Sequence, residues 1–125
     1  MAPLIAVVDD DPSVREGIES LMRSVGLKVR VFASAEEFLE AARPGETDCL
    51  VLDVRLGGMS GVDLNRRLVA GDYRTPVVFI TAHGSDDLAR REAASDWTAA
   101  YLTKPFSEDE LLDAVNAALK WEPRG

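Results

Sequence analysis

Hydrophobic positions along this chain fall into short apolar runs, which alternate with longer stretches where an apolar residue recurs every three or four positions. Short runs are typical of buried strands, and the longer period is typical of helices that pack through one face. The predicted strands span residues 4–8, 29–32, 49–54, 77–81 and 99–103. Because a helical stretch follows each strand, we predict an α/β fold of five βα units. Its doubly wound parallel sheet should be the middle layer of a three-layer sandwich.

Two segments differ from the rest in how much they can bury. Residues 28–31 alternate polar and apolar side chains, which predicts a half-exposed strand at the edge of the sheet. The helical stretch near residues 85–95 offers only Leu88 and scattered alanines for burial. Apolar burial stabilises by about 25 cal/mol per Å², so this helix should be the least firmly packed. We expect it to be the helix that moves.

Polar residues that satisfy free backbone amides mark four helix starts. A serine followed three residues later by an acidic residue has the spacing of a capping box, and an aspartate before proline places a cap ahead of the first helical position. These signals are Ser34 with Glu37, Ser60 with Asp63, Ser107 with Glu110, and Asp11 with Pro12. They fix where four of the five helices should begin.

Length and composition limit the classes of protein to consider. The 125 residues are 46% hydrophobic, which is enough for one packed core. We expect one domain over residues 1–122, with residues 123–125 as a C-terminal tail or the start of a linker. The formal net charge of -8 repels a phosphate backbone, so we expect no direct nucleic-acid contact from this domain. With no membrane-spanning apolar run and a lone Cys49, the expected location is cytoplasmic.

Polar side chains follow four of the five predicted strands. The first strand is followed by Asp9 and Asp10, the third ends in the region of Asp53, the fourth ends at Thr81, and Lys104 follows the fifth. The carboxyl ends of parallel strands meet at one edge of a sheet, where such folds bind ligands. We therefore expect these side chains to form one site.

The charges in this group predict a divalent cation. Two carboxylates about 5 Å apart repel by roughly 3 kcal/mol at an effective dielectric of 20, and Lys104 supplies one compensating charge to three aspartates. A hard ion such as Mg²⁺ suits oxygen ligands, and the lack of a His or Cys cluster argues against zinc. An ionised aspartate beside Mg²⁺, a hydroxyl and an ammonium together suit the acceptance of a phosphoryl group as an aspartyl phosphate.

Five segments in this order resemble the receiver domain of two-component response regulators. They read VVDDDP at residues 7–12, LDVRL at 52–56, MSGVDL at 59–64, ITAHG at 80–84 and LTKPF at 102–106. The chain looks most like the receivers that precede helix-turn-helix DNA-binding domains in nitrogen-fixation and nitrate-type regulators. The resemblance implies a flavodoxin-like fold with strand order 2-1-3-4-5.

The resemblance also implies a role for each residue of the site. Asp53 would be the phosphoacceptor. Mg²⁺ would be held by Asp10, Asp53 and the backbone carbonyl of Arg55, and Asp9 would join through water. Thr81 and Lys104 would hold the phosphoryl oxygens.

A switch and its partners follow from the same resemblance. Tyr101 would turn inward when Thr81 moves, and a cis bond would precede Pro105. A sensor histidine kinase would supply the phosphoryl group, so the domain would be a phosphoacceptor switch rather than an enzyme. Trp97 and Tyr101 would lie on the partner surface, where the helix near residues 85–95, the strand 99–103 and the last helix could form a homodimer.

Two positions depart from the family's usual pattern. Gly57 stands where the family usually has proline, so we expect a looser loop after Asp53 that phosphorylation orders. The family's usual glycine-alanine turn before the fifth strand is replaced here by Asp96, Trp97 and Thr98. The family pattern therefore does not predict the geometry of this turn.

Two other functions stay open from the sequence. Asp9 and Asp11 after the first strand, with Thr81 and Lys104 later, imitate an aspartate-nucleophile phosphatase of the haloacid dehalogenase type. In that phosphatase family the lysine precedes the second acidic pair. Here Lys104 follows the acidic pair at residues 86–87, which argues against this function. The other alternative is a binding module that keeps the receiver fold without regulation by phosphate.

Overall fold

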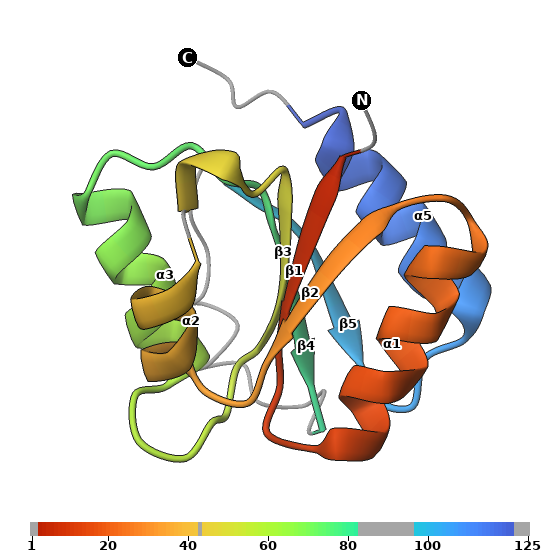
Figure 1. Ribbon diagram of the computed structural model, residues 1–125, viewed down its shortest axis with the longest axis horizontal. Helices are drawn as coiled ribbons and strands as arrows, with labels where there is room; N and C mark the ends of the chain where they lie inside the picture. Colours follow the sequence, from red (N-terminus) through yellow and green to blue (C-terminus); the bar gives the residue numbers. More distant parts are fainter. Residues whose placement is uncertain (1–2, 43, 83–96, 122–125) are drawn as a thin grey trace.

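Five parallel strands form a single sheet in the order β2-β1-β3-β4-β5 (Figure 1). The structure is a computed structural model that describes residues 3–42, 44–82 and 97–121. The strands are β1 Leu4–Val8, β2 Lys28–Phe32, β3 Cys49–Asp53, β4 Val77–Thr81 and β5 Thr98–Thr103. The flavodoxin-like fold and the strand order are confirmed, and the strand bounds differ from the predicted ones by one residue at three ends.

Helices cover both faces of this sheet and complete the three layers. The described helices are α1 Pro12–Ser24, α2 Ala35–Ala41, α3 Gly61–Ala70 and α5 Glu108–Leu119, with a short 3₁₀ turn at Pro44–Glu46. Figure 1 shows α1 and α5 on one face of the sheet and α2 and α3 on the other. The helix expected near residues 85–95 lies outside the described residues. Within the described ranges, no helix combines the length and the apolar composition needed to cross a bilayer.

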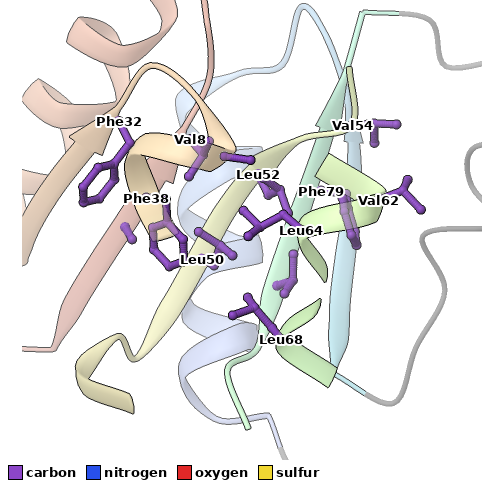
Figure 2. Packing of buried hydrophobic residues seen from close by; sticks show 13 residues of the cluster. Val8, Phe32, Phe38, Leu50, Leu52, Val54, Val62, Leu64, Leu68 and Phe79 are labelled. Carbon is purple, nitrogen blue, oxygen red and sulfur yellow. The ribbon is translucent and has the colours of Figure 1, made fainter. Parts of the chain in front are cut away.

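The two faces of the sheet bury separate hydrophobic clusters because successive residues of a strand point to opposite sides. From β3, Leu50 and Leu52 join the cluster under α2 and α3, whereas Cys49 and Val51 join the cluster under α1 and α5. Figure 2 shows the first of these clusters, in which Phe32 and Phe38 pack edge to face. Every residue of β3 and β4 is buried, so the strands that carry the site are held from both sides.

The edge strand β2 is half-exposed, as its alternating pattern predicts. The hydrophobic pattern fails at one position, just after α1. In β2, Lys28 and Arg30 are exposed while Val29 and Val31 are half-buried. The helical spacing of apolar residues that includes Ile18 and Met22 continues to Val25 and predicts that Val25 is buried, but this prediction is wrong because α1 ends at Ser24. Val25 lies beyond the last turn and leaves 49% of its surface exposed.

All four predicted caps are present, and they start helices directly after the loops at the carboxyl edge. Each cap side chain accepts a hydrogen bond from the backbone N–H two or three residues on; the caps are Asp11, Ser34, Ser60 and Ser107. At α5 the capping box is complete, since Glu110 also accepts a hydrogen bond from the Ser107 N–H. The loops before α1, α3 and α5 are therefore short and have fixed ends.

Replacement of the α5 cap should measurably destabilise the domain. Ser107→Ala leaves free amides in the first turn of α5, and the expected loss is about 1 kcal/mol in the free energy of unfolding. Urea denaturation followed by circular dichroism measures this change. Ser20→Ala, an exposed position within α1, is the matched control and should not lower the midpoint. Equal midpoints for the two variants would contradict the assignment of Ser107 as a stabilising cap.

Candidate functional site

Three aspartates meet at the carboxyl edge of the sheet. Asp9 and Asp10 follow β1, and Asp53 ends the neighbouring strand β3. One carboxylate oxygen from each of the three lies within 4.8 Å of the others. The structure therefore brings together the acidic residues that the sequence placed at different strand ends.

Asp9 is fully buried, and its polar atoms are already engaged. Its Oδ1 accepts the Asp11 N–H at 2.9 Å, and its Oδ2 lies 2.9 Å from the Lys104 Nζ. Its backbone N–H donates to the Phe32 carbonyl at 3.1 Å. Because both carboxylate oxygens are held and the residue is inaccessible, Asp9 is poorly placed as the nucleophile of a phosphatase. Asp10 is exposed and forms the open side of the cluster.

Asp53 is buried at the centre of the site and carries a raised pKa. Burial raises the pKa of its carboxyl most, and the charge of Asp9 raises it further. The Arg55 N–H, 2.9 Å from Oδ1, and the Lys104 ammonium, 3.1 Å from Oδ2, act in the opposite direction. The balance leaves the ionised form of Asp53 less favourable than that of an exposed aspartate.

The ammonium of Lys104 lies between two carboxylates. Burial lowers its pKa, but the neighbouring carboxylates of Asp9 and Asp53 outweigh this effect, so the pKa of Lys104 is raised. Its backbone N–H donates to the Thr81 carbonyl at 2.7 Å, and the Lys104–Pro105 peptide bond is cis, as the resemblance implied. The side chain is thus fixed as a cation at the carboxyl edge.

Thr81 and Tyr101 lie on the two strands beyond Asp53. Thr81 is buried at the end of β4 and follows Ile80, the residue paired with Asp53 in the sheet. Tyr101 of β5 pairs with Phe79, and their ring centroids are 6.3 Å apart. Tyr101 is half-buried against the cluster under α2 and α3. Thr81 therefore adjoins the acidic cluster, and Tyr101 lies two residues before the strand end.

The donor set fits a hard divalent cation. Three carboxylates within 4.8 Å offer oxygen ligands alone, and the Arg55 backbone is adjacent to them because its N–H bonds the Asp53 carboxylate. Mg²⁺ prefers such oxygen ligands and commonly uses one or two carboxylates together with waters and phosphate oxygens. Among the described residues, Asp9, Asp10 and Asp53 form the group whose carboxylate oxygens lie close enough together to bind one metal ion.

A comparison with protein-family models gives a match to the response regulator receiver domain over residues 5–116. The chain belongs to this family. The expected family is confirmed, and an acidic pocket at the carboxyl edge of the sheet is typical of its members.

Individual relatives of this receiver domain include proteins named as response regulators and as transcriptional regulators. The chain is 46% identical to Nodulation protein W of Bradyrhizobium diazoefficiens over 92% of its own length and 50% of the relative. It is 40% identical to the transcriptional regulatory protein FixJ of Azorhizobium caulinodans over 92% of its length and 54% of the relative. The solved structure of response regulator StyR shares 46% identity with a TM-score of 0.83, covering 96% of this chain and 60% of StyR. The chain spans about half the length of the curated relatives it matches.

Arg15 is a residue of this receiver domain that no sequence pattern singled out. Its guanidinium Nη1 donates to the backbone carbonyl of Asp9 at 2.8 Å. The first turn of α1 thereby holds the strand end that carries Asp9 and Asp10. A basic residue on a helix does not reveal which carbonyl it reaches, so no sequence signal identified this contact.

The segment before β5 departs from the family pattern, and the structure describes its last part. Trp97 is half-buried, and its carbonyl accepts the Val77 N–H at 2.7 Å. The pairing of β4 with β5 shifts register between Val77 and Val78. Trp97 is thus joined through its backbone to the amino end of β4, away from the acidic cluster. Residue 96 lies outside the described residues.

Removal of the central charge should stabilise the metal-free domain. Asp53→Asn keeps an oxygen for the Arg55 N–H and removes a buried charge, so the urea midpoint at neutral pH in EDTA should rise above that of the wild type. Each unit by which the Asp53 pKa is raised corresponds to about 1.4 kcal/mol.

The pH dependence of that difference checks the cause. The folded wild type takes up a proton at Asp53 at a higher pH than the unfolded chain does, because folding raises this pKa. The advantage of Asp53→Asn should therefore shrink as the pH falls through the raised pKa toward the ordinary range of aspartate. An advantage that is constant with pH would contradict the electrostatic explanation.

Loss of the Arg15 contact should destabilise the domain more than loss of an exposed arginine of the same helix. Arg15→Met leaves the carbonyl of buried Asp9 without this donor, at an expected cost of about 1–3 kcal/mol in the free energy of unfolding. Arg23→Met is the control, because Arg23 is exposed and pairs with Glu19 at 3.4 Å, and it should change the stability by less than about 0.5 kcal/mol. Equal losses in urea denaturation would refute the role given to Arg15.

Proposed function

We propose that this domain is a phosphorylation-dependent switch of a two-component system, with Asp53 as the phosphoacceptor. The observation that supports the proposal most is the placement of a buried carboxylate beside two others and a lysine ammonium. A carboxylate oxygen of Asp53 attacks the phosphorus, the bond from phosphorus to the donor's histidine nitrogen breaks, and the imidazole keeps the electron pair. The domain then acts as an acceptor rather than as an enzyme that turns over a substrate.

The metal ligands proposed are Asp10, Asp53 and the backbone carbonyl of Arg55. Bound Mg²⁺ neutralises the crowded carboxylates and binds phosphoryl oxygens. Asp9 contributes through water, which is consistent with both of its oxygens being held by Asp11 and Lys104. Asp10, which is exposed, is free to face an incoming ion.

Lys104 and Thr81 are proposed to hold the transferred phosphoryl group. The Lys104 ammonium lies 3.1 Å from Asp53 Oδ2, so it needs only a small movement to bind an oxygen of a phosphoryl group on Asp53. The buried hydroxyl of Thr81 lies at the end of the adjacent strand. Tyr101, on the next strand, is proposed to follow the movement of Thr81 and so to change the outer surface.

A sensor histidine kinase in the cytoplasm is the proposed donor. An apolar groove of about 480 Å³ is lined by α1, by the start of α5 and by the loop that carries Lys104 and Phe106. A protein donor that rests in this groove would bring its phosphohistidine to Asp53. The proposed response is a change at a partner or homodimer surface that includes Trp97 and Tyr101.

The wider organisation is part of the same proposal. We take residues 1–122 as the receiver domain and residues 123–125 as a tail or the start of a linker. The relatives are about twice as long as this chain, which supports an output segment in the whole protein. The net charge of -8 favours protein partners over direct nucleic-acid contact by the receiver itself.

Intact-mass measurement after treatment with acetyl phosphate tests the proposed chemistry. The wild type should gain the mass of one phosphoryl group in Mg²⁺ and none in EDTA, because the ion offsets the charge that collects at Asp53. Asp53→Asn should gain none. Asp63→Asn is the matched control, since Asp63 is exposed on α3 beside Arg66, and it should be labelled like the wild type. Labelling of Asp53→Asn, or equal labelling without metal, would refute the proposal.

A further inference from the structure

The loop between β3 and α3 carries the residues just after the proposed phosphoacceptor, and its base is tightly closed. The Gly61 N–H donates to the Val54 carbonyl at 3.0 Å, which joins the two ends of the loop. A Cβ at Gly61 would overlap the Asp53 carbonyl oxygen, so the backbones are in direct contact there. The base of the loop is therefore fixed by the fold.

The tip of this loop has much less intrinsic stiffness. Gly57 and Gly58 are adjacent and exposed, and Gly58 has a φ of 78°, a conformation that other residues rarely adopt. Two glycines lose more backbone entropy on ordering than other residues do. A proline in place of Gly57 would restrict the chain without any outside contact.

A carboxylate from α2 holds this tip. Glu36, in the first turn of α2, accepts the Met59 N–H, with Oε1 at 3.3 Å and Oε2 at 3.5 Å from the nitrogen. The same carboxylate lies against Gly58, where an added Cβ would be 2.8 Å from Oε2. The bare backbone of Gly58 and the side chain of Glu36 thus fit each other, although they lie 22 residues apart.

We propose that Glu36 is a positioning residue for the phosphoryl-accepting site. Its carboxylate orders the tip of the β3–α3 loop from outside and supplies a restriction that the two glycines of the tip lack. Ordering of the tip keeps the Arg55 backbone beside Asp53, where the Arg55 carbonyl is proposed to bind Mg²⁺. This inference rests on the proposed function and extends it to a residue on the far side of the loop.

Two measurements on Glu36→Ala test the proposal. The dissociation constant for Mg²⁺ should rise about three- to tenfold, the range expected when one hydrogen bond that orders a ligand loop is lost. Hydrogen exchange in the metal-free protein should accelerate at the Met59 amide, because this amide loses its acceptor. Glu36→Gln keeps an oxygen acceptor and should stay close to the wild type in both measurements.

Matched variants separate this role from a general loss of stability. Glu40→Ala removes another exposed carboxylate from α2 and should change neither the affinity nor the exchange. Gly57→Pro should restore most of the Mg²⁺ affinity lost in Glu36→Ala, because a Cβ at Gly57 has open space and proline stiffens the tip by itself. The same substitution should have little effect when Glu36 is present.

The outcomes distinguish the two proposals. A wild type that takes up no Mg²⁺ overturns the proposed function. A wild type that binds Mg²⁺ while Glu36→Ala binds it equally well overturns the role of Glu36 alone. Equal effects of Gly57→Pro with and without Glu36 also overturn that role. They would show that the Glu36 side chain and a proline at position 57 do not restrict the same loop movement.

Discussion

The crowding of three carboxylates around one ammonium is the constraint on which the rest of this structure depends. Carboxylate oxygens of Asp9, Asp10 and Asp53 lie within 4.8 Å of one another. The opposing charge is the Lys104 ammonium, whose Nζ lies 2.9 Å from Asp9 Oδ2 and 3.1 Å from Asp53 Oδ2. Asp9 and Asp53 are held close together, because β1 and β3 are neighbouring interior strands packed between two hydrophobic clusters. The stability of the core keeps these like charges close together, and a divalent cation and a phosphoryl group are the ligands proposed to bind there.

The strand ends and loops around this cluster are each tied to a different helix or strand. Arg15 joins the end of β1 to α1, Glu36 joins the loop after β3 to α2, and the backbone N–H of Lys104 joins the loop after β5 to β4. The site and the loop beside it therefore contact helices on both faces of the sheet, α1 on one and α2 on the other.

The sequence predicted the strands, the edge position of β2 and all four caps, because these depend on local periodicity and on side chains that bond nearby amides. It also predicted the meeting of the acidic residues, since parallel topology brings strand ends to one edge. The contacts of Arg15 and Glu36 were not predictable, because each reaches a backbone group that only the folded chain brings near. The loop at Gly57 was expected to be loose from its composition, whereas a side chain 23 residues before Met59 holds its tip. The burial of Val25 could not be predicted either. Its spacing fits the apolar face of α1, but the helix ends one residue before it and leaves its side chain exposed.

Calorimetric titration of the metal-free protein with Mg²⁺ tests the central claim most directly. The account predicts uptake of one ion per chain, accompanied by release of protons, since the pKa of Asp53 is raised before the ion enters. Proton release is measured by repeating the titration in buffers of different ionisation enthalpy. No heat of binding at millimolar Mg²⁺, or the same uptake after Asp10 and Asp53 are both replaced by asparagine, would contradict the account.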